Sequence, residues 1–119
     1  MTMKRLMLLA VLLLIPLGLR AVSYIAYEQL TIDSTAGGIK MTATKITPAG
    51  LPQATPAVCK LETAQVRYTI DGTAPTTTLG TPWDVGETRT FNGHDILFAF
   101  RGIRTGSSSG VANCDYSAP

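Results

Sequence analysis

The sequence is poor in the residue types that build catalytic and metal sites. Its 119 residues include one histidine, one tryptophan and two cysteines, and two thiols cannot complete a four-ligand zinc site. The histidine, His94, has Asp95 beside it, but adjacent strand residues face opposite ways and no nucleophile accompanies them. The serines at 107–109 lack the Gly-x-Ser-x-Gly context of a nucleophile elbow, and turn chemistry explains them. We therefore expect a non-enzymatic protein that needs no metal and no cofactor.

Basic residues are also few, and they form no patch. Of the ten lysines and arginines, Lys4, Arg5 and Arg20 precede residue 21, which leaves seven cations against eight carboxylates. Those seven are dispersed along the chain, whereas nucleic-acid-binding proteins cluster their cations to displace counterions from phosphates. We expect no nucleic-acid partner.

Beyond residue 23 the chain lacks an amphipathic helical run of about 10–15 residues, which a parallel sheet needs for its crossovers. It is rich in Thr, Ala, Gly and Ser with scattered Val, Ile, Tyr and Phe, a composition that favours strands and turns. We predict an all-β domain over residues 24–119, preceded by an apolar N-terminal segment. Its fold would be a small antiparallel β-sandwich of about seven or eight strands, Ig-like or jelly-roll-like.

The strand predictions follow the two-residue period of side chains along a strand. Strands are expected at residues 24–32, 39–46, 58–61, 65–70, 88–91, 96–103 and 111–116. The clearest is 65–70, in which Val66, Tyr68 and Ile70 point to one face. The proline-rich stretch 48–56 is expected to be a connecting loop, because proline removes a ladder hydrogen bond.

A tight reversal is predicted directly after the 65–70 strand. Asp71 and Gly72 form a dipeptide that tolerates positive φ, and Pro75 removes an amide donor just beyond it. Like several other carboxylates of the chain, Asp71 lies at a predicted turn. An Asx-turn explains these positions, and a calcium site is the alternative.

Residues 1–23 have the layout of a signal peptide. They begin with a cationic pentapeptide, continue with the apolar stretch 6–19, and end in small residues at 21–23. As a helix, residues 6–19 would rise about 21 Å, less than the ~30 Å hydrocarbon core, so their membrane contact is expected to be transient. The alternatives are a retained membrane anchor and a product that starts at Val22 and never contains the segment.

The two cysteines, Cys59 and Cys114, lie on different predicted strands. An even cysteine count behind an export-like segment predicts one disulfide, which would tie the last strand to the middle of the domain. Two separately buried thiols are the alternative, favoured if the protein folds in the cytoplasm.

Trp83 is the single tryptophan, and it precedes a predicted turn at 85–87. We expect its indole to be a core side chain packed against aromatic residues of the strands. The alternative is a ligand-stacking platform, in which Trp83 and a tyrosine stack on sugar rings.

Three blocks of the sequence resemble small β-sandwich virion proteins of tailed bacteriophages. They are YIAYEQLTI at 24–32, AQVRYTIDGTAPT at 64–76 and IRTGSSSG at 103–110, followed by a closing strand with NCDY at 113–116. The resemblance implies a structural protein located in the virion, a minor capsid decoration or head/tail accessory protein. Its partners would be capsid or tail proteins, and its copies would form a homo-oligomer on a repeating lattice. The part YTIDGTAPT is also weakly similar to the C-terminal β-sandwich modules of chitobiase and hexosaminidase-type glycosidases.

The export-like segment and the cysteine pair favour a second hypothesis, a secreted adhesion or carbohydrate-binding β-sandwich module. Such a module would be secreted or held in the periplasm or at the cell surface. Its partner would be a glycan, bound through Trp83.

Overall fold

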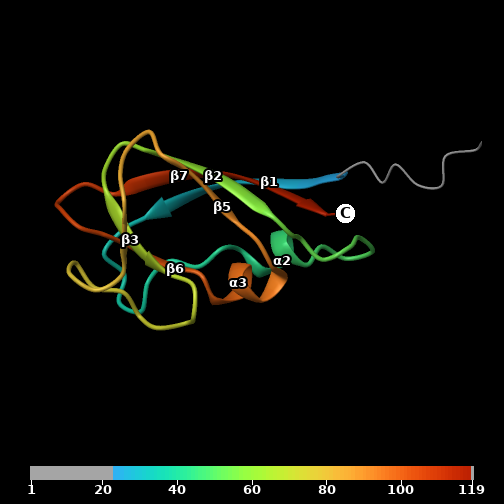
Figure 1. Cartoon of the computed structure of the whole chain (residues 1–119), viewed down its shortest axis with the longest axis horizontal. Coiled ribbons are helices and arrows are strands. Elements are labelled where there is room, and N and C mark those ends of the chain that lie inside the picture. The colour runs from blue at the N-terminus through green and yellow to red at the C-terminus, as the bar shows by residue number, and fades with distance from the viewer. Residues whose placement is uncertain (1–22, 119) are drawn as a thin grey trace, which may run out of the picture.

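Alternating side chains place seven strands in two antiparallel sheets that face each other (Figure 1). The computed structural model describes residues 23–118, so residues 1–22 of the predicted signal-like segment lie outside the described part. The four-stranded sheet has the order β1-β7-β2-β5, with bounds Ser23–Ile32, Gly110–Ala118, Ala57–Glu62 and Thr88–Phe91. The three-stranded sheet has the order β4-β3-β6, with bounds Thr81–Trp83, Val66–Thr69 and Arg101–Arg104. The predicted antiparallel β-sandwich is confirmed.

Two short helices also join the strands, so the domain is mostly β. α2 (Ala43–Ile46) lies between β1 and β2, and α3 (His94–Ala99) lies between β5 and β6. Each helix buries one aliphatic side chain, Ile46 from α2 and Leu97 from α3. Within residues 23–118, neither helix has the length and apolar character needed to cross a membrane.

The four-stranded sheet turns every second residue toward the core. In β2 and β7 the inward residues are buried and those between them are exposed or half-buried. Strand pairing sets one inward row across all four strands: Glu28 on β1, Cys114 on β7, Cys59 on β2 and Arg89 on β5. The row therefore carries a charged side chain on each edge strand and the cysteines at its centre.

Cys59 and Cys114 form the predicted disulfide. They are direct partners in the antiparallel pairing of β2 and β7, with Cα atoms 4.1 Å apart and a sequence separation of 55. Both side chains are fully buried. The bond ties the last strand to the middle of the chain, as the sequence predicted.

The core between the sheets is built around aromatic rings. Tyr68 of β3 contacts the rings of Trp83, Phe91 and Phe100, with centroids 5.8, 5.3 and 5.8 Å away. Trp83 has no exposed surface and Tyr68 is 9% exposed. The prediction that Trp83 is a core residue is confirmed.

Residues 39–46 do not form the predicted strand. Their pairing in the described chain is a single bridge between Ile39 and Gly102, and α2 follows. The reason lies in β1, where the buried Glu28 carboxylate accepts hydrogen bonds from the backbone N–H and the hydroxyl of Thr42. The chain turns at that contact, and Ile46 enters the core from a helix.

The predicted strand 96–103 is divided between α3 and β6. The carbonyl of Gly93, a residue with φ 105°, accepts hydrogen bonds from the N–H groups of Ile96 and Leu97, which starts a helical turn. Asp95 in the first turn suits the positive end of the helix dipole. The apolar run there lacks a clear two-residue period, so it fits either element.

β3 is two residues shorter than predicted, one at each end. It ends at Thr69, and Ile70 is 43% exposed instead of sharing the core face of Val66 and Tyr68. The chain leaves the β-ladder there, and in the turn that follows the N–H of Gly72 donates to the carbonyl of Ala99.

β4 is a strand that the sequence pattern did not reveal. It contains Pro82, which normally argues against a strand. β4 lies at an edge of its sheet and pairs with β3 alone among the described strands, so the missing N–H of Pro82 costs no ladder bond.

Candidate binding surface

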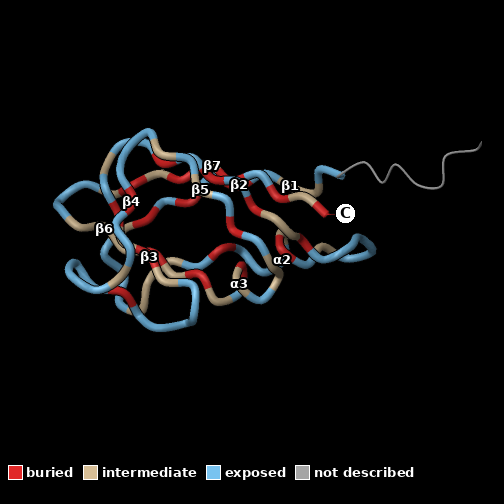
Figure 2. Tube along the Cα trace, viewed as in Figure 1, coloured by how far each residue is buried: buried red, intermediate tan, exposed pale blue. Residues whose placement is uncertain are grey.

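The side of the four-stranded sheet that points away from the core is open to solvent (Figure 2). We call it the outer face, and its residues alternate with the buried ones. They are Tyr24, Tyr27, Gln29, Thr31, Val58, Lys60, Glu62, Thr88, Thr90, Val111, Asn113, Asp115 and Ser117. Most of these side chains are neutral hydroxyls, amides and phenols, which suits a surface that hydrogen bonds without burying many charges.

Three large side chains stand out on the outer face. Tyr24 is 63% exposed, Tyr27 is 46% exposed and Val58 is 39% exposed. The hydroxyl of Tyr27 donates to Asn113 Oδ1 at 2.6 Å, and Gln29 Nε2 donates to the same oxygen at 3.3 Å. These bonds hold the Tyr27 ring against the sheet, which lowers the entropy lost when a partner packs on it.

Sequence reasoning singled out neither Tyr24 nor Tyr27. The available signal was the alternation in 27–32, where Leu30 and Ile32 are buried and Tyr27, Gln29 and Thr31 are exposed. Glu28 breaks that alternation because a carboxylate occupies an inward position.

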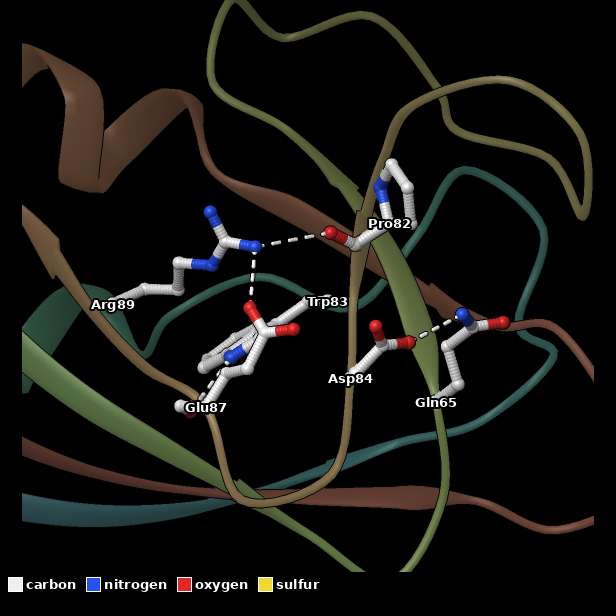
Figure 3. Close-up of polar contacts among 6 residues, drawn as sticks. All are labelled: Gln65, Pro82, Trp83, Asp84, Glu87 and Arg89. Atoms are coloured by element: carbon white, nitrogen blue, oxygen red, sulfur yellow. Dashed lines mark hydrogen bonds and ion pairs between the residues drawn. The ribbon is translucent and has the colours of Figure 1, made fainter.

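Trp83 does not offer its ring to a ligand. Its indole is fully buried, and Nε1–H donates to the carbonyl of Glu87 at 2.9 Å across the β4–β5 turn (Figure 3). The ring also packs edge to face with Tyr68 and Phe91. An indole buried in this way has no exposed ring face on which a sugar could stack.

Polar contacts around that turn join the edges of the two sheets. Arg89 Nη2 donates to Glu87 Oε2 at 2.7 Å and to the carbonyl of Pro82 at 3.3 Å (Figure 3). Gln65 Nε2 donates to Asp84 Oδ1 at 2.5 Å. The Arg89 and Glu87 side chains are 33% and 43% exposed, so their ion pair contributes at most about 1 kcal/mol and acts mainly by positioning.

A hollow of about 340 Å³ opens beside β5. It is lined by Tyr68, Ile70, Arg89, Thr90, Phe91, Asn92 and Ile96. A neighbouring hollow of about 260 Å³ shares Tyr68 and Ile70 and extends to Asp71 and Gly80. The half-exposed Ile70 therefore lines both depressions.

Asp71 and Gly72 lie in a bend that follows β3, and the connection to β4 runs on over residues 70–80 instead of making a tight reversal. Gly72 has φ 84°, and the backbone N–H of Thr73 donates to Asp71 Oδ1 at 3.0 Å. The N–H and the hydroxyl of Thr73 lower the pKa of Asp71, as expected for an Asx-turn carboxylate. Pro75 is buried beneath this turn.

His94 and Asp95 lie at the start of α3. The His94 ring lies edge to face with Phe98 at 4.9 Å, and Nδ1 lies 3.3 Å from the carbonyl of Ala54. These contacts tie the helix to the 48–56 loop. In the part of the chain that the structure describes, no three His, Cys, Asp or Glu side chains are placed to hold a metal ion.

Glu28 is the one buried carboxylate among the described residues, at 7% exposed. Its Oε1 accepts hydrogen bonds from the Tyr116 hydroxyl at 2.7 Å and from the Thr42 N–H at 3.0 Å. Burial, and then the hydrogen bond and charge of Glu28, raise the pKa of Tyr116 above its ordinary value. This cluster connects β1, β7 and the segment before α2.

Replacing Tyr116 by phenylalanine should lower the free energy of unfolding by about 1–2 kcal/mol at neutral pH, because Glu28 loses a donor. The folded wild type holds the phenolic proton to higher pH than the unfolded chain. Stability from this group is therefore complete below about pH 10 and falls as the pH rises further. Denaturant titrations at several pH values should show a smaller alkaline loss in Tyr116→Phe, and identical pH dependence would contradict this.

No family model matches the chain, and no match was found among curated proteins or solved structures.

Proposed function

We propose that this chain is a non-enzymatic structural protein of a tailed-bacteriophage virion, a minor capsid decoration or head/tail accessory protein that binds other proteins. The observation that carries the proposal is the ordered set of three sequence blocks at 24–32, 64–76 and 103–110. In the sandwich these blocks supply β1, then β3 with the turn after it, and then the last two residues of β6 with the loop to β7. The resemblance thus extends over both sheets instead of one local motif.

The outer face supports a binding role. Tyrosine gives a large, rigid contact area at low entropic cost, and neutral hydroxyl and amide groups around it supply adaptable hydrogen bonds. On a repeating lattice, many copies bound side by side convert modest single contacts into stable attachment. Capsid or tail proteins would be the partners, and neighbouring copies would form the homo-oligomeric array.

Mass spectrometry of purified particles tests this function directly. We expect peptides from 24–118 in particles that have been banded and washed at high salt. Their absence from such particles, with the protein present in the lysate, would remove the virion hypothesis.

A lysine in place of Tyr27 should reduce the number of copies per particle at least about tenfold, because a charge would be buried in the contact. The matched control is Leu79→Lys, which changes a 51% exposed side chain on a loop away from the outer face. Quantitative mass spectrometry of particles carrying each variant measures the copy number. Equal loss in both variants, or no loss in either, would show that the outer face is not the contact.

The disulfide favours a second candidate function, a secreted binding module that recognises a glycan. Disulfides persist in oxidising compartments, which fits export through the 1–23 segment. With Trp83 buried, the exposed rings for such a ligand are those of Tyr24 and Tyr27. Intact mass and N-terminal sequencing of the native protein separate the candidates: a start near Tyr24 supports export, and a start with methionine in place of Val22 supports cytoplasmic synthesis.

A further inference from the structure

The edge of β5 has backbone groups that no described strand uses. The Cα separation of 4.1 Å between Cys59 and Cys114 marks them as a narrow pair, in which the backbone groups point away from each other. Cys59 therefore directs its N–H and C=O toward Arg89 of β5. Leu61, two residues on, follows the same alternation, since its N–H donates to Glu87 and its carbonyl accepts from Gly86.

It follows that Thr88 and Thr90, on either side of Arg89, point their N–H and C=O groups away from β2. Among the described strands, β5 pairs with β2 alone and ends the strand order. Both threonines are exposed. A row of free N–H and C=O groups at a sheet edge is complementary to one kind of occupant, an extended polypeptide segment.

The hollow beside this edge specifies a side chain of that segment. Its lining includes the aliphatic side chains of Ile70 and Ile96 and the rings of Tyr68 and Phe91, whose centroids are 5.3 Å apart. Alternate side chains of an added strand point to one face. One of them would enter this hollow, where a branched aliphatic group fits the lining.

Arg89 adds a charge to the same site. Its Nη2 is bonded to Glu87 and Pro82, and its other terminal nitrogen points away from both (Figure 3). Arg89 lines the hollow, so this nitrogen suits a carboxylate on the incoming segment. A second copy of the chain is disfavoured in the register that pairs Thr88 with Thr90 of two antiparallel β5 edges, because that register places Arg89 opposite Arg89.

We propose that the free edge of β5 docks an extended segment of a different partner protein, which adds a fifth strand to the four-stranded sheet. The segment places a branched aliphatic side chain in the hollow and a carboxylate, two residues away on the same face, near Arg89. The proposal rests on the proposed function as a protein-binding module and names the chemistry of its partner.

The test is an NMR titration of the ¹⁵N-labelled, oxidised full chain with the capped peptide acetyl-Thr-Ile-Thr-Glu-Thr-amide. We expect saturable shifts of the Thr88, Thr90 and Asn92 amides. A peptide with lysine in place of glutamate, and one with its central amide N-methylated, should each bind at least about tenfold more weakly. Equal binding of all three peptides, or shifts confined to other residues, would overturn the proposal.

Variants locate the binding on the protein. Thr90→Pro removes the edge N–H, and its matched control is Thr31→Pro at the opposite edge of the same sheet. Ile70→Asp charges the lining of the hollow, and its control is Leu51→Asp, a side chain that is 54% exposed elsewhere. We expect loss of peptide shifts in the first member of each pair and retention in the second.

Three outcomes would overturn the β5 site. They are loss of peptide binding in both members of a pair, retention in both, and β5 shifts that depend on protein concentration without peptide, which would identify a second copy as the occupant. Mass spectrometry of particles tests the proposed function independently of peptide binding. Presence in particles without peptide binding would therefore reject this site alone.

Discussion

Trp83→Ala is expected to lower the free energy of unfolding by about 3–5 kcal/mol, the usual cost of removing a buried tryptophan side chain. Domains of this size have only about 5–15 kcal/mol in total, so the variant should be marginally folded. Three losses combine: the apolar area of the indole, its edge-to-face contacts with Tyr68 and Phe91, and the hydrogen bond from Nε1 to the carbonyl of Glu87.

Denaturant unfolding followed by circular dichroism measures this effect, because the variant loses the single tryptophan that would report by fluorescence. Trp83→Phe is the matched control. It keeps a ring in the site and loses the N–H donor, so its cost should be smaller, roughly 1–3 kcal/mol. An alanine variant within about 1 kcal/mol of wild type would show that the indole is not a core residue in solution.

Removing the disulfide should have an effect of similar size. For a sequence separation of 55, the chain-entropy model gives a stabilisation of roughly 4 kcal/mol, which acts by restricting the unfolded chain. The Cys59→Ala, Cys114→Ala double variant should lose about 2–5 kcal/mol. Alanine is the replacement of choice because both sites are fully buried and a serine hydroxyl would need a partner.

The control for the disulfide variant is the neighbouring pair on the outer face. Lys60 and Asn113 are direct partners one residue away from the cysteines, and their double alanine variant should cost less than about 1 kcal/mol. Unfolding in guanidinium chloride should be measured with and without prior reduction in denaturant. Reduced wild type should have the same free energy of unfolding as the cysteine double variant. Equal stability of oxidised and reduced wild type would contradict the expected role of the bond.

Several predicted strands match the structure closely, namely 24–32, 58–61, 88–91 and 111–116. Residues 58–61 and 111–116 alternate between the core and the outer face, and the structure places them in β2 and β7. Their period determines which side chains face the core. The disulfide was predicted from the even cysteine count behind an export-like segment, and the sandwich from the number of strands and the lack of crossover helices.

The errors arise where a distant residue decides the local structure. Residues 39–46 have strand-forming composition, but the Glu28 carboxylate, 14 positions earlier in the chain, takes the N–H and hydroxyl of Thr42. The inward position of Glu28 is visible only once β1 is paired. The same holds for Pro82, whose missing donor is harmless because β4 is an edge strand.

The candidate binding surfaces were harder to predict than the core. The sequence analysis considered Trp83 as a ligand-stacking residue and did not single out Arg89. Arg89 nevertheless shares an inward face with Phe91 in the segment TRTF. The hollow beside Ile70 is lined by Tyr68 of β3, Phe91 of β5 and Ile96 of α3, which lie far apart in the sequence. No local pattern encodes how these segments come together.

The pairing of Ser23 with Ala118 places the start of β1 and the end of β7 at the same end of the domain. Ser23 therefore lies beside the end of the last strand, while the loop before Gly110 lies at the opposite end of β7, where Gly110 pairs with Ile32 (Figure 1). A label attached at Ser23 or at Ala118 would therefore lie at one end of the domain and leave the 105–109 loop unobstructed at the other.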